Sequence, residues 1–330
     1  MSQRKLYSLF GSMLGGLLLT VMSVIPVSAA TSSGSGGSGL KISPVVTNLT
    51  INAGQSQTVT LYVQNVTSST LTVQALVNDF TSSNNETGTP NLLLNNQYAP
   101  THSLKRYVAP LSNVSLQPGQ QKSVSVVITI PSGISGGGYY GAVRFVPVTA
   151  SGGGTVSLTA SLASLILVKV PGNYNEAVEL LSFDAGNSGG GSSVLFTSNK
   201  HVVANARFQN SGAVQEQPFG KILLESGTKV LASYEINSTT PRGNVLPGSI
   251  RKFTVNLDKV GSFGQYTLIG NFGYGTNGQL LSAKTTFYVI PLPIIGLVIL
   301  LILIILFLAI GIPKWVRRHD RRVLQRAPRR

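Results

Sequence analysis

Few side chains in this sequence have the type and spacing that catalysis needs. Gly186-Asn187-Ser188-Gly189-Gly190 formally matches G-x-S-x-G, which exposes a nucleophilic serine between a strand and a helix. Here the match lies in a run of serine and glycine, and no helical pattern follows it. His102 and His201 are isolated from each other, and the chain contains no cysteine. The sequence therefore predicts no catalytic residues, no bound metal and no cofactor.

The acidic residues give one alternative to this prediction. A glycosidase needs two carboxylates that flank the scissile bond, and nine acidic residues lie between positions 31 and 313. Glu176 and Glu179 are the closest of these in sequence, but their place at the start of a predicted strand favours solvated side chains. An accessory subunit of an envelope enzyme or transport complex stays the alternative, because carboxylates can converge only in the fold.

Aromatic and arginine side chains are better candidates for binding another molecule, because both types are enriched at interfaces. Alternation along the predicted strand at 141–146 turns Val143 and Phe145 toward the core and leaves the neighbouring positions on the opposite face. Packing of arginine on tyrosine between strands is the alternative interpretation of such a pair. We predict that four residues of this strand and the preceding segment are exposed partner contacts: Tyr107, Arg106, Tyr140 and Arg144.

The N-terminus has the features of a segment that directs export. Two basic residues, Arg4 and Lys5, precede an apolar stretch at 6–27 and a small-residue site that ends at Ala30. We predict a signal peptide at 1–30, and an uncleaved signal anchor is the alternative because the apolar stretch approaches the length of a membrane span. The composition of residues 31–39, TSSGSGGSG, predicts a flexible linker.

The C-terminus predicts a single transmembrane helix at 290–313. Ile294–Ile312 contains no charged side chain, and at 1.5 Å per residue a helix of this length spans about 28 Å. The basic residues of the tail at 314–330 predict a cytoplasmic tail by the positive-inside rule, with the bulk of the chain outside the plasma membrane. We expect four residues at the membrane interface: Trp315, Lys314, Arg317 and Arg318.

The charge distribution excludes a nucleic-acid binder. The net charge is +15, but much of the excess lies at the two ends of the chain. Residues 31–313 carry 15 basic and 9 acidic residues, which is too even a balance for a nucleic-acid footprint. Only 11% of the residues are charged, against about 25% in ordinary proteins. Serine, threonine, asparagine and glutamine must therefore make the predicted exterior soluble.

Alternating apolar residues predict an all-β fold for the part between the two apolar ends. A short repeat recurs three times: a turn ending in Gly54, Gly119 or Gly248 is followed by apolar residues at +5, +7 and +9. Strands at this spacing favour two tandem immunoglobulin-like β-sandwiches, at 40–172 and 173–289, with the boundary at Pro171-Gly172-Asn173. We predict that Ser151–Gly154 is a hairpin loop and that Asp184–Ser193 is a loop.

Five Asn-x-Ser/Thr sequences keep a second alternative open. In a eukaryotic secretory chain they would accept glycans on surface loops, which would suit a glycosylated type I adhesion receptor. In a bacterial surface protein rich in these residues they arise by chance. The asparagines concerned are Asn48, Asn65, Asn85, Asn113 and Asn237.

One region resembles a known family. Asn113–Phe145 combines a Pro-Gly turn, an alternating strand, Ile-Pro and a glycine-rich run before Gly-x-x-x-Phe, and it resembles the first domain of the Gram-positive WxL-interacting surface proteins. Ile42-Ser43-Pro44 followed by Ala53-Gly54-Gln55 is similar to the opening of that domain. The resemblance implies a first domain with peptidoglycan-binding character and a second domain that contacts host or other surface proteins.

These observations predict a membrane-anchored cell-surface protein that is not an enzyme. Its exterior sandwiches are expected to bind a surface protein or a cell-wall polymer, as in adhesion or scaffolding at the envelope. An extended partner segment could add to an exposed sheet edge. No small-molecule substrate and no nucleic acid is expected among its partners.

Overall fold

The computed structural model describes residues 39–148 and 161–315. These residues form an all-β chain of two sandwiches followed by one apolar helix, as the sequence predicted. The predicted signal peptide, the linker up to residue 38 and the basic tail from residue 316 lie outside the described residues. The predicted boundary at residue 172 falls between two strands, and the exact domain limits stay a prediction.

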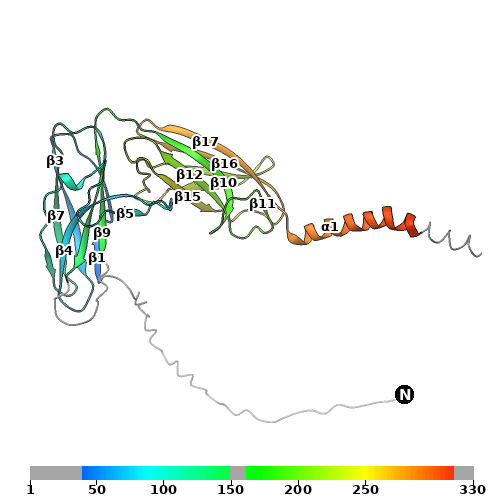
Figure 1. Cartoon of the computed structure of the whole chain (residues 1–330), viewed down its shortest axis with the longest axis horizontal. Coiled ribbons are helices and arrows are strands. Elements are labelled where there is room, and N and C mark those ends of the chain that lie inside the picture. The colour runs from blue at the N-terminus through cyan, green and yellow to red at the C-terminus, as the bar shows by residue number, and fades with distance from the viewer. Residues whose placement is uncertain (1–38, 149–160, 316–330) are drawn as a thin grey trace, which may run out of the picture. The chain divides into compact units, whose positions relative to one another are not determined.

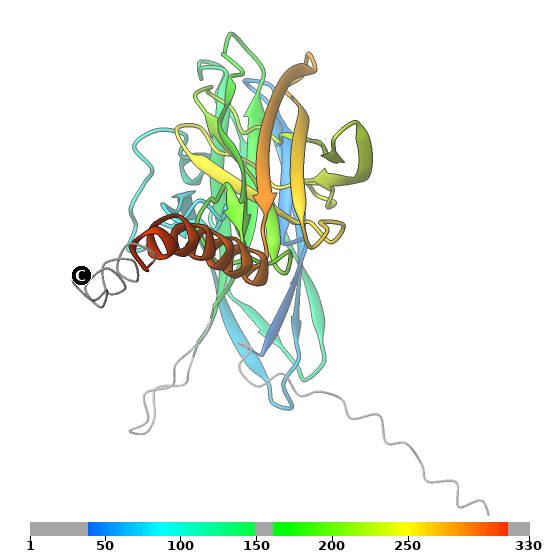
Figure 2. The ribbon, with the colours of Figure 1, turned by 90° about the vertical axis from the view of Figure 1, so that its right-hand side faces the viewer.

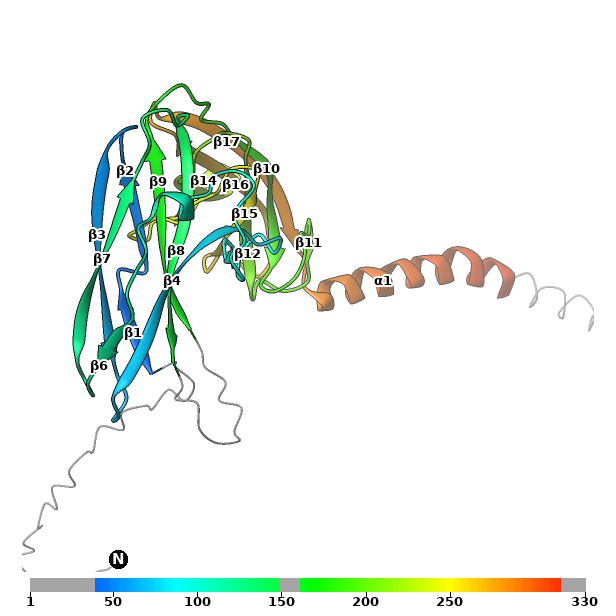
Figure 3. The same ribbon diagram turned by 60° about the vertical axis from the view of Figure 1, so that its left-hand side comes forward.

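Two sheets form the first sandwich. One has the strand order β1-β3-β7, and the other has the order β2-β9-β8-β4-β5, with β6 also paired to β4. Figure 3 shows β3 and β7 in one layer, beside β2, β9 and β8 in the other. The strands are β1 (Leu40–Ser43), β2 (Val46–Thr50), β3 (Ser56–Asn65), β4 (Leu71–Ser82), β5 (Pro90–Leu92), β6 (Val114–Leu116), β7 (Gln121–Thr129), β8 (Gly137–Pro147) and β9 (Leu162–Val170).

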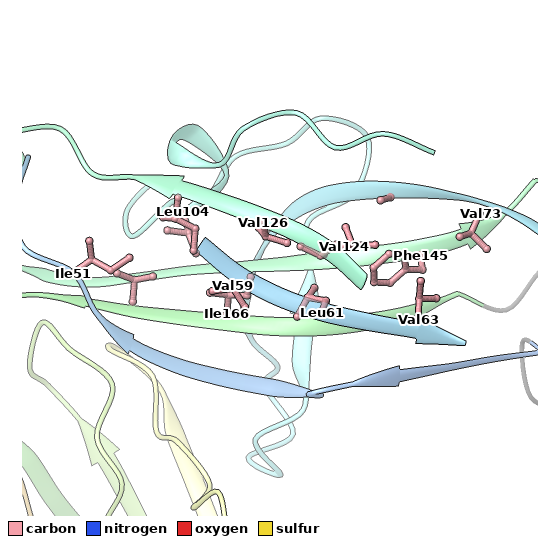
Figure 4. Packing of buried hydrophobic residues seen from close by; sticks show 14 of the residues in the cluster. Ile51, Val59, Leu61, Val63, Val73, Leu104, Val124, Val126, Phe145 and Ile166 are labelled. Atoms are coloured by element: carbon pink, nitrogen blue, oxygen red, sulfur yellow. The ribbon is translucent and has the colours of Figure 1, made fainter. Parts of the chain in front are cut away.

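The core between these two sheets contains the alternating apolar residues of both layers. Figure 4 shows Leu61 and Val126, from β3 and β7, among the side chains that face Phe145 and Ile166 from β8 and β9. All four side chains are fully buried. The core-facing positions predicted at Val143 and Phe145 are therefore confirmed. β8 and β9 pair as an antiparallel hairpin, whose predicted loop lies outside the described residues.

Two further sheets form the second sandwich. Their strand orders are β10-β12-β15 and β11-β17-β16-β13-β14, and the apolar core of this sandwich includes the buried rings of Phe208, Phe272 and Phe287. The strands are β10 (Val178–Asn187), β11 (Leu195–Phe196), β12 (Val202–Asn210), β13 (Phe219–Ser226), β14 (Lys229–Ile236), β15 (Ile250–Asn256), β16 (Gly264–Tyr274) and β17 (Gln279–Val289).

The repeated glycine turns begin core strands in both sandwiches. Gly54, Gly119 and Gly248 all have φ between +70° and +82°, a backbone conformation that glycine adopts without steric cost. Each turn leads into β3, β7 or β15, and the apolar residues at +5, +7 and +9 contact a core. The inward orientation that the sequence predicted for these alternate residues is confirmed.

The predicted loop at Asp184–Ser193 is wrong in its first half. Asp184–Asn187 continues β10 and pairs with Val202–Asn205 of β12. Ala185 is buried and Asp184 accepts a hydrogen bond from Asn205 Nδ2 at 3.2 Å, so both faces of this strand are occupied. Small and polar residues hid the alternation, and pairing with β12 overrides their weak strand propensity.

The apolar helix begins directly after the last strand. α1 (Leu292–Leu306) continues through a π-helical turn (Phe307–Gly311) to Trp315. Leu292–Trp315 as a whole is long and apolar enough to cross a membrane. Pro291 precedes its first turn, where a missing N–H costs no helical hydrogen bond.

Candidate functional site

Tyr140 is not the exposed contact that the sequence predicted. Its side chain is only 3% exposed and packs with Phe80, Ala142 and Leu167 on the outer face of the β8 sheet. Leu246 of the second sandwich packs against this cluster, and the Tyr140 hydroxyl donates a hydrogen bond to Gln215 Oε1 at 3.2 Å. Burial also raises the pKa of the Tyr140 phenol. The second sandwich covers this strand face, which the local sequence could not reveal.

We expect Tyr140→Phe to leave partner binding unchanged and to lower the free energy of unfolding by about 1 kcal/mol. The ring keeps its apolar contacts, whereas Gln215 loses its hydrogen-bond donor. Urea unfolding of the full chain in detergent micelles measures the loss. A marked drop in cell-wall retention without loss of stability would instead restore Tyr140 as a contact residue.

The other three predicted contacts differ in their exposure. Arg144 is half-buried, and its Nε donates to Asn78 Oδ1 at 3.2 Å. Tyr107 is also half-buried, with its ring edge-on to Tyr139 at a centroid distance of 5.8 Å. Of the four predicted contacts, only Arg106 is exposed. The structure therefore does not bring the four residues to one open surface.

Arg106 belongs to a small surface cluster that we call the Tyr98 patch, made of Tyr98, Lys105 and Arg106. The Lys105 ammonium and the Arg106 guanidinium lie 4.7 and 4.6 Å from the centre of the Tyr98 ring. Such cation–π contacts are stabilising. They also occupy the ring, which leaves less of it free to stack on a ligand.

Asp79 positions this patch, although no sequence motif marks it. Its carboxylate is fully buried in β4. Oδ2 accepts the backbone N–H of Ala99 at 2.9 Å, and Oδ1 accepts that of Lys105 at 2.8 Å. These two bonds fasten the long connection between β5 and β6 to the sheet. A lone acid in an apolar strand carries no recognisable motif.

The solvent face of the β1-β3-β7 sheet is an open polar surface of the first sandwich. We call it the hydroxyl face. Tyr62 is 44% exposed on β3, between Ser43 of β1 and Ser123 of β7 in the strand register. Outward positions around it carry hydroxyl or amide groups rather than acids. The hydroxyl face consists of Ser43, Thr58, Thr60, Tyr62, Gln64, Gln121, Ser123 and Ser125, with Lys41 at its edge.

The first sandwich has no free carboxylate on its surface. Residues 40–172 contain six basic residues but only two acids, Asp79 and Glu86. Asp79 is buried, and Glu86 forms a two-pronged ion pair with Arg207 of the second sandwich, at 2.8 and 2.5 Å. The hydrogen bonds from Arg207 hold the pKa of Glu86 below its usual value, so this carboxylate stays ionised and paired. The surface left over is neutral and cationic.

A cleft of about 540 Å³ lies where β2 and β9 meet loops of the second sandwich. Glu216 lines this cleft, and its Oε2 accepts the Gly275 N–H at 3.0 Å, whereas Oε1 has no partner among the described residues. Burial and the nearby Glu176 carboxylate raise the pKa of Glu216 to about 7. Glu176 pairs with Lys169 at 3.0 Å and accepts two hydrogen bonds from Thr276, which contradicts its expected solvated position.

The hydrogen bonds to Glu176 lower its pKa against the opposing effect of its burial. Glu179, its sequence neighbour, is exposed on β10 and takes no part in the cleft. Glu216 is therefore the acid that lines the cleft, and its charged neighbour Glu176 lies forty positions earlier in the sequence. Two acids so far apart in sequence form no local motif, so their proximity could not be predicted from the sequence.

The predicted membrane-interface residues are only partly described. Lys314 and Trp315 lie at the end of the apolar helix, where both side chains are exposed. Arg317 and Arg318 lie outside the described residues. Among the described residues, no group of three histidine or acidic side chains gathers in the way a metal site needs.

The fold and this surface define a class of protein: tandem β-sandwiches whose first member has an acid-free polar face, followed by one candidate membrane helix. Residues 47–146 match the family described as WxL Interacting Protein, peptidoglycan binding domain. The predicted resemblance of the first sandwich is thereby confirmed, and a domain of this kind is typical of a cell-wall-related surface protein. Among curated proteins, none matches the sequence.

Several of the solved structures that match this chain are fimbrial or pilus chaperones. The class 5 fimbriae chaperone CfaA is 14% identical, with a TM-score of 0.34, over 77% of this chain and 100% of its own. The E. coli chaperone DraB is 15% identical, with a TM-score of 0.31, over 76% and 96%. The Pseudomonas aeruginosa CupB2 chaperone is 10% identical, with a TM-score of 0.33, over 74% and 98%. At these TM-scores the likeness supports no functional argument.

Proposed function

We propose that the first sandwich binds an anionic cell-wall polymer without covalent attachment, and that the chain is not an enzyme. The observation that carries this proposal is the missing surface carboxylate. Asp79 is buried and Glu86 is paired with Arg207, so nothing on the first sandwich repels an anionic polymer. Basic side chains such as Lys41 and Arg106 remain exposed to attract it.

The hydroxyl face suits a glycan in particular. Sugar rings present hydroxyl groups at their edges and C–H groups on their faces, so they are recognised by hydrogen bonds together with an aromatic ring. The exposed Tyr62 ring offers an apolar surface and a polar tip, and the flanking Ser43 and Ser123 offer hydrogen bonds. A flat sheet face also matches an extended polymer better than a closed pocket does.

Glu216 and the neighbouring Glu176 do not favour catalysis. Both oxygens of Glu176 accept hydrogen bonds, from Lys169 and Thr276, so this side chain offers no free nucleophile or base. A retaining glycosidase needs both carboxylates available to the substrate. The pair is better explained as part of the packing between β9 and the second sandwich.

Membrane anchoring completes the proposal. α1 is uncharged and none of its residues is buried, and such a helix is stable only in lipid or against another apolar surface. The basic residues that follow it favour a cytoplasmic tail, with both sandwiches outside. In this arrangement the chain links cell wall to membrane, which is an adhesive or scaffolding role.

The second sandwich offers an edge strand to which a protein partner could bind. β14 is an edge strand of its five-stranded sheet, and Val230 on it is exposed. An extended segment could pair with this edge. The glycosylated-receptor alternative is less compatible with the fold, because Asn65 is fully buried and its Nδ2 donates to Ser69 O and Leu116 O.

Sedimentation of the full chain, in detergent micelles, with purified cell-wall sacculi tests this proposal. We expect Tyr62→Ala to weaken retention about tenfold, which corresponds to about 1.4 kcal/mol of binding energy. Tyr98→Ala should act less, because Lys105 and Arg106 already occupy that ring. Retention should also fall as salt rises, because exposed charges are screened.

Tyr288→Ala is the matched control, since Tyr288 is a tyrosine of similar exposure on the second sandwich. It should leave retention unchanged. If wild-type protein is not retained by sacculi, the cell-wall role is wrong. If Tyr62→Ala and Tyr288→Ala behave alike, the polymer binds elsewhere than the hydroxyl face.

A further inference from the structure

One end of the second sandwich exposes an unusual group of large apolar side chains. Val194 is 63% exposed, Leu195 51%, Phe263 61% and Tyr288 41%. We call these four residues the apolar rim. Large apolar side chains grouped at one place on a soluble surface mark a site of contact with a protein or a membrane.

Strand pairing places all four residues at the same end. Leu195 pairs with Tyr288 in the β11–β17 ladder, and the Tyr288 N–H donates to Val194 O at 2.8 Å. Gly264 pairs with Val289, which puts Phe263 beside the last position of β17. The rim therefore surrounds the point at which the chain leaves the sandwich.

The chain passes from this point straight into the apolar helix. Val289 is fully buried and the Ile290 N–H donates to Phe196 O at 2.8 Å, so the strand is held to its end. Only Ile290 and Pro291 separate β17 from α1. Figures 1 and 2 show β17 ending where the helix starts. There is no stalk between them.

This short junction brings the rim within reach of lipid. Two extended residues cover about 7 Å, and the headgroup layer on each side of a bilayer is about as thick. If α1 spans the membrane, residues paired with the last positions of β17 must lie at that layer. Tyrosine and other amphipathic or apolar side chains are favoured there.

The charges near the rim are compatible with a lipid surface. Asn199 Nδ2 donates to Val260 O at 2.9 Å, which holds the turn with the exposed Lys200 beside the segment that leads to Phe263. Lys259 is also in this segment, but Asp258 lies 3.4 Å from its ammonium and offsets its charge. Lys200 can thus contact an anionic headgroup.

We propose that the apolar rim inserts into the headgroup layer of the membrane, so that the second sandwich rests on the bilayer. This inference rests on the proposed membrane anchor. It goes beyond the anchor because a spanning helix alone would allow the sandwich to swing free of the surface. If the second sandwich is held against the lipid, its position is fixed while the first sandwich binds the cell wall.

Tryptophan quenching in the full chain tests the rim. Trp315 is the single tryptophan and is replaced by phenylalanine, after which one reporter is introduced per variant. Phe263→Trp reports the rim, Leu300→Trp reports the helix, and Leu280→Trp is the control. Leu280 is 81% exposed and lies nine positions before Val289 on β17, about 30 Å along the strand.

Each variant is reconstituted in vesicles that contain phospholipid brominated near the headgroup end of the acyl chains. We expect the Phe263→Trp reporter to lose about half of its fluorescence, whereas the Leu280→Trp reporter stays nearly unquenched. The emission of the Phe263→Trp variant should also shift to shorter wavelength on reconstitution.

Three other outcomes would overturn the proposal, and they differ in what else they imply. Equal, weak quenching in the Phe263→Trp and Leu280→Trp variants, with strong quenching in Leu300→Trp, rejects the rim but keeps the anchor. A blue-shifted but unquenched Phe263→Trp reporter means that a second copy or another protein covers the rim. An unquenched Leu300→Trp reporter rejects the anchor and the rim together.

Discussion

Replacing Asp79 by alanine is expected to lower the free energy of unfolding by about 3–5 kcal/mol, since each hydrogen bond to a buried charged group contributes about 1.5–3 kcal/mol. Asp79 is fully buried and accepts backbone N–H groups from Ala99 and Lys105. Alanine leaves both donors without a partner inside the protein. The connection that carries the Tyr98 patch then loses its attachment to β4.

Urea unfolding of the full chain in detergent micelles measures this loss, and amide exchange locates it. Exchange should quicken first at Ala99 and Lys105. Asp79→Asn keeps one acceptor oxygen and should fall between alanine and wild type. Glu179→Ala is the control, because Glu179 is an exposed acid whose removal should change little. A loss below about 1 kcal/mol for Asp79→Ala would show that water replaces the carboxylate.

The strands of this protein could be predicted from sequence because their signal is local. A glycine turn and alternate apolar residues occur within ten positions, as at Gly119 and β7, where the predicted inward residues are all buried. The signal for the apolar helix, an uninterrupted run of apolar residues, is local as well. Both features depend on side-chain periodicity, which needs no knowledge of the rest of the fold.

The wrong assignment of Tyr140 has the opposite cause. Alternation correctly placed Tyr140 on the face opposite Phe145, but whether that face meets solvent depends on the second sandwich. Its partner Gln215 lies 75 positions away. Sequence alternation separates two faces of a strand and does not say what covers each of them.

The number of charged residues can be read from the sequence, but their pairing cannot. Counting showed few acids in the first sandwich, but only the fold shows that Glu86 reaches Arg207, 121 positions later. The same holds for the cleft, where Glu176 and Glu216 approach consecutive backbone amides at Gly275 and Thr276. Long-range pairs of this kind set the surface potential and the pKa values, which are the properties most relevant to binding.

Glu216 should make the protein less stable as the pH rises from about 4.5 to 7. Burial and the charge of Glu176 raise its pKa to about 7 in the folded chain, against a usual value of 4.5. Between these two values the folded state holds a proton that the unfolded state has released. The free energy of unfolding therefore falls with increasing pH, by up to about 3 kcal/mol in all, since one pKa unit corresponds to about 1.4 kcal/mol.

We expect Glu216→Gln to remove this slope. Glutamine keeps an acceptor for the Gly275 N–H and carries no charge, so nothing is lost when the pH rises. The variant should match wild type near pH 4.5 and exceed it by up to about 3 kcal/mol at pH 8. Urea unfolding at four pH values between 4.5 and 8 measures the difference.

Two further variants separate this effect from other titrations. Glu179→Gln is the matched control, because Glu179 is exposed and its loss should leave the slope intact. Glu176 has a lowered pKa, so its stabilising ion pair is lost only as the pH falls below about 4.5, outside the Glu216 window. Glu176→Gln should nevertheless shift the Glu216 slope to lower pH, because it removes the neighbouring charge that raises the pKa of Glu216. A wild-type slope that persists in Glu216→Gln would mean that another group titrates there and that the Glu216 carboxyl is ionised at little cost.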